Sequence, residues 1–182
     1  MLVTSRPLRI MFQDEARFGR LMEPQACWAP YPMRPIIPQG VVREYMYAYT
    51  AVSPIDGHID YTIQPFLDSE NVSKFLKYLS EQHRKEEIFL VWDGARAHTG
   101  VEVVMPSNIH TILLPPRSPR LNPVESFWGE LREKFFHNFT FESIPALMDY
   151  LILSLCMIKD DKWKLKRLLG FNWINKIILN AT

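Results

Sequence analysis

The most informative segment for the fold runs from Arg43 to Gln64 and reads REYMYAYTAVSPIDGHIDYTIQ. Tyrosine and β-branched residues over Arg43–Val52 predict a strand, and Ser53–Gly57 (SPIDG) is a typical turn signal. Ile59–Gln64 then returns as a second strand. The stretch therefore predicts an antiparallel hairpin.

The hydrophobic period changes on the C-terminal side of this hairpin. An amphipathic helix is expected over Ser69–His83, because apolar residues there recur at helical spacing: Val72, Phe75, Leu76 and Leu79. Ile88–Trp92 is a short apolar run typical of a buried strand, and it ends in Asp93. Ile109–Leu114 is expected to be a second buried strand of the same kind.

On the N-terminal side, Leu8–Asp14 predicts another strand, and this one too ends in a carboxylate. Residues 23–40 carry five prolines, which suits an irregular loop or an edge strand and excludes a helix.

The C-terminal third predicts helices. Asn122 is a good N-cap, Pro123 suits the first helical position, and Glu125 stands where a capping box would place it. The expected buried stripe of this helix is Val124, Phe127, Trp128, Leu131 and Phe135. Two more helices are expected, over Pro145–Met157 and Asp161–Ile178. A hairpin, a β-α-β unit and flanking helices together indicate the α/β class, with a mixed sheet covered by helices.

Length and composition indicate one folded domain of 182 residues, with 47% hydrophobic and 23% charged residues. Cys27 and Cys156 form neither a CxxC pair nor a zinc spacing, which favours a reduced, cytoplasmic setting. The most apolar stretch, Leu147–Ile158, is too short to span a bilayer, and the N-terminus lacks the apolar core of a signal peptide. The net charge of +1 neither demands nor excludes nucleic acid as a partner.

Three acidic residues stand where they can converge. Asp14 and Asp93 each close an expected strand, and ligand sites in α/β sheets lie at such edges. Glu125 lies in the first turn of a helix, on the flank of the buried stripe that it shares with Gly129 and Arg132. Two carboxylates ~4 Å apart repel by roughly 4 kcal/mol at an effective dielectric of 20, so a cluster of three indicates either a bound cation or raised pKa values. Oxygen ligands favour Mg²⁺ or Mn²⁺.

Each acid also has a purely structural interpretation. Asp14 suits a strand end, and Asp93 followed by Gly94 is a good turn dipeptide. Glu125 suits the role of capping-box partner of Asn122.

Three segments decide between these interpretations: QDEARFG (Gln13–Gly19), VWDGARAHTG (Val91–Gly100) and LLPPRSPRLNPVESFWGELREKF (Leu113–Phe135). They resemble the three signature blocks of bacterial insertion-sequence transposases related to mariner, in the DDE transposase superfamily. The resemblance covers about residues 8–140, and the third block is its most specific part. This chain departs from the usual pattern at Gly94, where the family has Asn, and at Arg117, where it has an aromatic residue.

The resemblance implies a ribonuclease H-like fold in which Asp14, Asp93 and Glu125 hold the catalytic metal, expected to be two Mg²⁺ or Mn²⁺ ions. It implies double-stranded DNA as the partner, both transposon ends and target, and a homodimer in the active complex. A bacterial cytoplasmic enzyme that meets the nucleoid when acting is expected. No helix-turn-helix region precedes Asp14, so residues 1–182 are expected to be a single catalytic domain with C-terminal helices over about 144–180, as a truncation or a split-frame product.

Further residues are candidates for contacts with DNA: His98, Arg117, Arg120, Arg132, Lys164, Lys166 and Arg167. A structural histidine, solvated arginines and a Trp163 that packs into the protein are the alternatives. Glu15 is expected to point to the face opposite Asp14. For the whole chain, the alternatives to an active transposase are another ribonuclease H-like metal nuclease, or an inactive DNA-binding remnant.

Overall fold

Five strands form one mixed sheet in the computed structural model, which describes residues 6–21, 26–36, 42–94, 103–174 and 176. The strand order is β3-β2-β1-β4-β5. The strands are β1 (Leu8–Gly19), β2 (Tyr45–Ser53), β3 (His58–Gln64), β4 (Glu87–Trp92) and β5 (Ile109–Leu113). This is the mixed α/β sheet predicted from the sequence.

The predicted hairpin is confirmed. β2 and β3 pair antiparallel from Tyr47↔Gln64 to Ser53↔His58, and Gly57 in the turn between them has a φ of 67°. β1 pairs antiparallel with β2 on one side and parallel with β4 on the other, and β4 pairs parallel with β5. The change from antiparallel to parallel pairing therefore occurs at β1, in the centre of the sheet.

β1 is longer than predicted, because it continues through Asp14 to Gly19. Its parallel pairing with β4 ends at Phe12↔Val91, but its antiparallel pairing with β2 goes on to Gly19↔Tyr45. The prediction that Asp14 closes the strand was wrong, since a strand with a neighbour on each side continues as long as one neighbour does.

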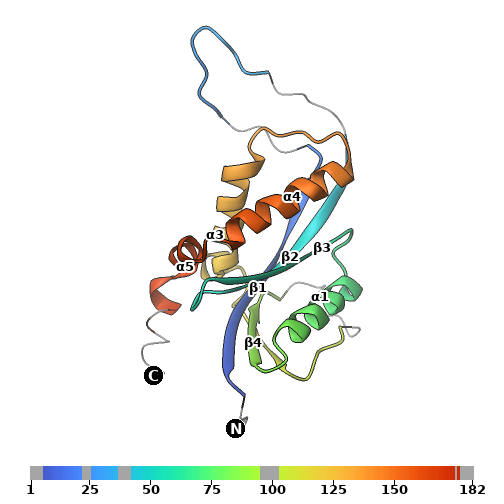
Figure 1. Cartoon of the computed structure of the whole chain (residues 1–182), viewed down its shortest axis with the longest axis vertical. Helices are drawn as coiled ribbons and strands as arrows, with labels where there is room; N and C mark the ends of the chain where they lie inside the picture. Colours follow the sequence, from blue (N-terminus) through green and yellow to red (C-terminus); the bar gives the residue numbers. More distant parts are fainter. Residues whose placement is uncertain (1–5, 22–25, 37–41, 95–102, 175, 177–182) are drawn as a thin grey trace.

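Helices cover both faces of the sheet (Figure 1). α1 (Ser69–Gln82) packs on one face, where Val72, Phe75, Leu76 and Leu79 are buried as predicted. α3 (Pro123–Leu131), α4 (Ile144–Lys159) and α5 (Lys162–Leu169) pack on the other face and build the larger of the two cores.

Two of the expected elements differ in the structure. β5 is an edge strand in which Ile109 is buried while Leu113 is 59% exposed, so it is not the buried strand that its apolar run suggested. α5 ends at Leu169 rather than near Ile178, because Gly170 follows with a non-helical ψ of 68°.

The buried stripe of α3 changes phase after Leu131. Arg132–Phe136 forms a π-helical turn (η2), in which the wider turn carries the buried position one residue further along. Phe136 is consequently buried, whereas Phe135, the residue predicted from α-helical spacing, is only partly buried at the edge of the core.

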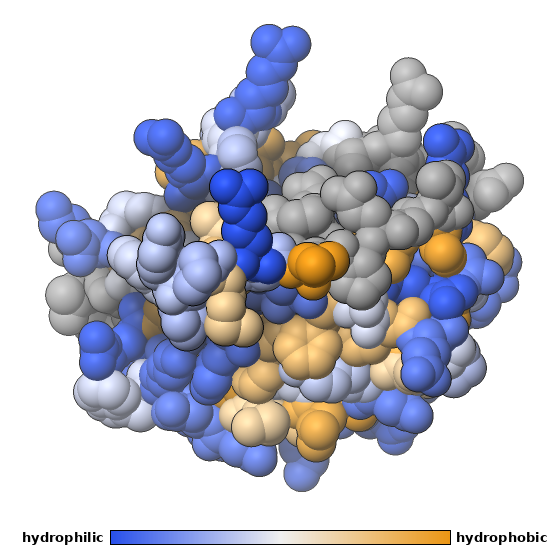
Figure 2. Space-filling view, turned by 90° about the horizontal axis from the view of Figure 1, so that it is seen from above, coloured by the Kyte–Doolittle hydropathy of each residue, from blue (hydrophilic) through white to orange (hydrophobic). Residues whose placement is uncertain are grey.

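The proline-rich segment between β1 and β2 is irregular over its described residues 26–36, as predicted. This segment projects from the sheet (Figure 1). Seen from above, the surface of the molecule carries hydrophobic side chains beside hydrophilic ones (Figure 2). The segment's exposed apolar side chains are Trp28, Tyr31, Met33 and Ile36. Cys27 and Cys156 are exposed and form no disulfide. Over the part of the chain that the structure describes, no helix is both long enough and apolar enough to cross a bilayer.

Candidate active site

Asp14 lies on the α3 face of the sheet. Alternate residues of a strand point to opposite faces, and the even-numbered neighbours Phe12 and Ala16 both belong to the core beneath α3. The parallel register with β4 ends at Phe12↔Val91. Continued by two residues, the same register sets Asp14 level with Asp93.

Asp93 follows the last residue of β4 and lies on the same face, because Val91 also packs into the core beneath α3. The fold thus brings two carboxylates from adjacent parallel strands to one edge, where the ladder between the strands ends. The sequence predicted this juxtaposition although it mistook the end of β1.

Glu125 is brought to this edge by the start of α3. The Asn122 side chain accepts a hydrogen bond from the Val124 N–H (3.1 Å) and donates one through Nδ2 to the carbonyl of Gln13 (2.9 Å). Asn122 is buried, so this single side chain both caps the helix and fixes its first turn against β1 beside Asp14.

The capping-box alternative for Glu125 does not hold. In a capping box the glutamate accepts a hydrogen bond from the N–H of the cap residue, but the Asn122 N–H donates to the carbonyl of Pro119 (2.9 Å). Glu125 is exposed, and its side chain faces the same pocket as the two aspartates.

The three acids line one pocket of about 530 Å³. Its other walls are Gly94, Asn122 and the proline-rich segment Leu113–Pro119. The three carboxylates share this pocket without forming a closed cluster: among the described residues, only His58, Asp60 and His83 bring three potential ligand atoms within 4.8 Å of one another. Mutual repulsion opposes closer approach without a cation.

Electrostatics link the three acids. Burial and then the charges of Glu125, Glu15 and Asp93 together raise the pKa of the Asp14 carboxyl to about 7, although the hydrogen bond that Asp14 accepts from the Glu15 N–H (2.9 Å) opposes the rise. A carboxyl surrounded in this way binds either a proton or a metal ion at neutral pH.

Glu15 points away from this pocket, as predicted. Its Oε1 accepts a hydrogen bond from Gln13 Nε2 (2.7 Å), and its charge acts on Tyr49 in the core beneath α1. It influences Asp14 through space from the opposite face of the sheet.

The other predicted residues are scattered. Arg117 lines the acidic pocket with a φ of 59°, and Arg120 is exposed in the adjoining turn η1 (Pro119–Leu121). Arg132 lines a neighbouring groove, with its guanidinium 5.6 Å from the centre of the Phe18 ring. His98 lies outside the described residues.

The basic residues of α5 lie away from the acidic pocket. Lys164 forms an ion pair with Glu130, and the Arg167 guanidinium lies 4.7 Å from the centre of the Trp163 ring. Lys166 is exposed. Trp163 is 69% exposed, so the interpretation that it packs into the protein was wrong.

A second groove, which the sequence did not predict, lies beside α3. This groove of about 920 Å³ runs along the exposed side of α3 from Gly129 to Arg132, and it is also lined by Arg17 and Arg43. Arg17 belongs to the QDEARFG block, but only the extension of β1 past Asp14 brings it to the wall of this groove. Glu44 and Glu133 in the same groove leave it with mixed charge.

Comparison with known proteins identifies this arrangement. A protein of Sinorhizobium fredii (strain NBRC 101917 / NGR234), described as uncharacterized protein y4pE/y4sA, is 26% identical over 133 residues, which cover 72% of this chain and 98% of that protein. The Mos1 strand transfer complex matches 89% of this chain and 50% of its own, with a TM-score of 0.67 and 14% identity. The Mos1 mariner paired end complex with Mn matches over 89% of this chain and 54% of its own chain, with a TM-score of 0.63 and 14% identity.

The chain spans about half the length of these Mos1 chains, and the likeness establishes the ribonuclease H-like fold. A family model described as DDE superfamily endonuclease matches residues 9–148, which include all three acids of the pocket. The chain therefore belongs to the DDE superfamily of endonucleases.

Proposed function

We propose that this chain is the catalytic domain of a DNA transposase, which cuts phosphodiesters at insertion-sequence ends and joins the 3′ ends to target DNA. In this proposal Asp14, Asp93 and Glu125 are the catalytic, metal-binding residues. The observation that supports this proposal is that three acids from three separate elements line one pocket. Within the pocket, burial and the charges of Glu125 and Asp93 raise the pKa of Asp14.

The donor set fits a hard divalent cation. All three side chains offer carboxylate oxygens, the ligands that Mg²⁺ and Mn²⁺ prefer, and the described residues that line the pocket include no histidine or cysteine. The similar Mos1 paired end complex contains Mn. We assign two such ions to the pocket, which would activate the attacking oxygen and stabilise the leaving one.

The residues around the acids have distinct tasks in this proposal. Asp14 is the most buried of the three and has its pKa raised to about 7, so a bound cation would favour its charged form and would couple metal binding to the protonation of this carboxyl. Asn122 keeps Glu125 against β1 through its bond to the Gln13 carbonyl. Arg117, on the rim, is placed to contact a phosphate of the bound strand.

The substrate is double-stranded DNA. A separate groove lined by Arg17, Arg43 and Arg132 lies beside the C-terminal end of α3, and guanidinium groups there suit phosphates of the bound DNA. Pairing of two transposon ends would require a homodimer, acting at the bacterial nucleoid.

The experiment is nicking of supercoiled plasmid with Mn²⁺ at low salt. We expect the parent to nick the plasmid and Asp93→Asn to lose at least 100-fold of that activity, because metal positioning and charge stabilisation of this kind are worth several kcal/mol. Asp149→Asn is the matched control, since Asp149 is an exposed acid on α4. Equal nicking by all three proteins would exclude the acidic pocket as the active site.

Strand transfer separates a transposase from another metal nuclease of the same fold. A fluorescent duplex with a free 3′-hydroxyl is incubated with the plasmid, and covalent joining of the label is measured. Joining that disappears in Asp93→Asn supports the transposase. Nicking without any joining, with faster cleavage of an RNA–DNA hybrid, would favour the nuclease.

A further inference from the structure

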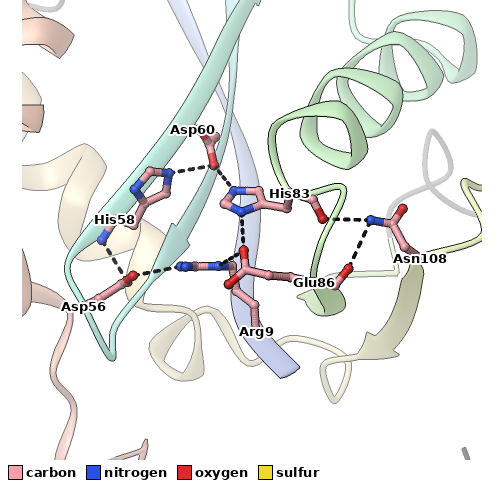
Figure 3. A network of polar contacts seen from close by, with 7 residues as sticks. All are labelled: Arg9, Asp56, His58, Asp60, His83, Glu86 and Asn108. Atoms are coloured by element: carbon pink, nitrogen blue, oxygen red, sulfur yellow. Dashed lines mark hydrogen bonds and ion pairs between the residues drawn. The ribbon is translucent and has the colours of Figure 1, made fainter. Parts of the chain in front are cut away.

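A second polar cluster, formed around His58, Asp60 and His83, is shown in Figure 3 and lies on the face of the sheet opposite the acidic pocket. His58 and Asp60 project from β3, and His83 is the residue that ends α1. Asp60 pairs with Ala51, which belongs to the core beneath α1, so the two β3 side chains face α1. Asp60 and His83 are buried, and His58 is partly exposed.

The two imidazoles converge on one carboxylate oxygen. His58 Nε2 lies 3.0 Å from Asp60 Oδ2, and His83 Nε2 lies 2.7 Å from the same atom. The candidate ligand atoms of the three residues all lie within 4.8 Å of one another. In a tetrahedral zinc site, Zn–N and Zn–O bonds of ~2.0–2.2 Å put ligand atoms roughly 3.3–3.5 Å apart, so shifts of about an ångström or less would admit an ion.

We propose that His58, Asp60 and His83 form a transition-metal site that prefers Zn²⁺, separate from the oxygen-lined catalytic pocket. Two imidazole nitrogens and one carboxylate oxygen are a typical three-residue zinc set, which leaves a fourth position for water. The partial exposure of His58 opens this position to solvent.

Outer residues already orient the ligands. His83 Nδ1 donates to Glu86 Oε2 (2.6 Å), which in turn accepts from Arg9 Nε (2.8 Å). A proton held on Nδ1 by a carboxylate leaves Nε2 as the metal-binding nitrogen, which is the arrangement found around most zinc-bound histidines. Arg9 also donates to Asp56 Oδ2 (2.9 Å), so Asp56, Arg9 and Glu86 form a chain behind the cluster (Figure 3).

An ion here would join three parts of the chain that are distant in sequence. It would tie the start of β3 to the end of α1, and through Glu86 and Arg9 to the start of β1. The site would therefore stabilise the end of the sheet that α1 covers, without contributing a ligand to the acidic pocket.

The test measures Zn²⁺ bound to the whole chain, by equilibrium dialysis against micromolar ZnCl₂ and elemental analysis. We expect one Zn²⁺ per chain in the parent and in Asp93→Asn, and at least tenfold weaker binding in His58→Gln and Asp60→Asn. His110→Gln is the matched control, because His110 is exposed to the same 28% as His58 and also contacts a carboxylate, Glu87, at 2.9 Å. Binding that survives His58→Gln, or that is lost in Asp93→Asn, overturns the proposal.

Thermal unfolding gives an independent measurement. At a zinc concentration about 100 times Kd, the parent and His110→Gln are expected to gain about 5–10 °C in Tm, and His58→Gln is expected to gain none. An unchanged Tm of the parent at millimolar Zn²⁺ contradicts the site.

A measurement on the parent alone covers the case in which a variant fails to fold. Histidine ring ¹⁵N NMR during Zn²⁺ titration should show Nε2 of two histidines, His58 and His83, shifting together and saturating at one equivalent. No shift at either ring, or shifts at His110 instead, would contradict the assignment.

Discussion

Folding without metal favours the protonated form of the Asp14 carboxyl group, whereas a bound cation would favour its charged form. Burial and the charges of Glu125, Glu15 and Asp93 raise its folded-state pKa from 3.8 to about 7. A carboxyl whose pKa is raised by folding favours the folded state while it is protonated. That contribution is present below about pH 4 and is lost as the pH rises through 7. The residue best placed to bind a cation therefore destabilises the cation-free protein at neutral pH.

Asp14→Asn should accordingly stabilise the metal-free protein at pH 8, by about 1–4 kcal/mol, because a shift of one pKa unit corresponds to 1.36 kcal/mol. Near pH 4 the parent carboxyl is protonated, and the two proteins should unfold at nearly the same denaturant concentration. Urea unfolding in EDTA at both pH values measures this difference. A parent as stable as Asp14→Asn at pH 8 would show that burial and the neighbouring charges do not raise the pKa of Asp14.

Adding Mn²⁺ should reverse the order at pH 8, since the ion offsets the charge only where the carboxylate remains. The parent should gain stability with Mn²⁺, and Asp14→Asn should gain less. Asp149→Asn should follow the parent throughout, because Asp149 is exposed on α4.

At the scale of elements, the active-site geometry depends on how α3 begins. Asn122 caps the helix and donates to the carbonyl of Gln13 on β1, so the first turn of α3, which carries Glu125, is fixed to the strand that carries Asp14. Helix and strand thereby present their acids to one pocket.

Asn122→Ala and Asn122→Ser separate the two tasks of this side chain. Serine restores the N-cap but cannot donate a hydrogen bond to the Gln13 carbonyl as the asparagine amide does. Asn122→Ser should therefore recover about 1 kcal/mol of the free energy of unfolding that Asn122→Ala loses. Both variants should lower the nicking rate by ten- to a hundredfold, because Glu125 is no longer held against β1. If Asn122→Ser nicked DNA like the parent, the bond to Gln13 would be irrelevant to the site.

The same elements show which features the sequence predicts. Local patterns predicted the hairpin, α1 and the cap of α3, because turn residues, helical spacing and an N-cap are properties of neighbouring residues. The end of β1 and the π-helical turn were missed, since a strand's length depends on its pairing with β2, and the wide turn at Arg132–Phe136 depends on packing. The acids were predicted as a set only through the three motif blocks; each alone also fitted a structural role.

At the scale of the whole molecule, the sheet separates two polar centres. The acidic pocket and Arg132 lie on the side of α3, whereas His58, Asp60 and His83 lie on the side of α1. DNA bound for cutting should therefore contact the α3 side, although the net charge of the chain is only +1.

The salt dependence of DNA binding tests whether DNA contacts the α3 side of the sheet. Arg132→Gln should weaken binding several-fold at low salt and reduce the slope of log K against log salt by about 0.9, the value for one lost phosphate contact. Lys77→Gln is the control, because Lys77 is exposed on α1, on the other side of the sheet. Equal slopes for the two variants would place the DNA elsewhere.

Asp14, Asp93 and Glu125 are proposed to hold the catalytic metal together. Mn²⁺ binding measured by EPR tests this proposal directly, and it needs no DNA. Titration of the parent should show bound Mn²⁺, and Asp93→Asn and Glu125→Gln should each bind it at least tenfold more weakly, while Asp149→Asn binds it like the parent. Unchanged Mn²⁺ binding in both pocket variants would contradict the account.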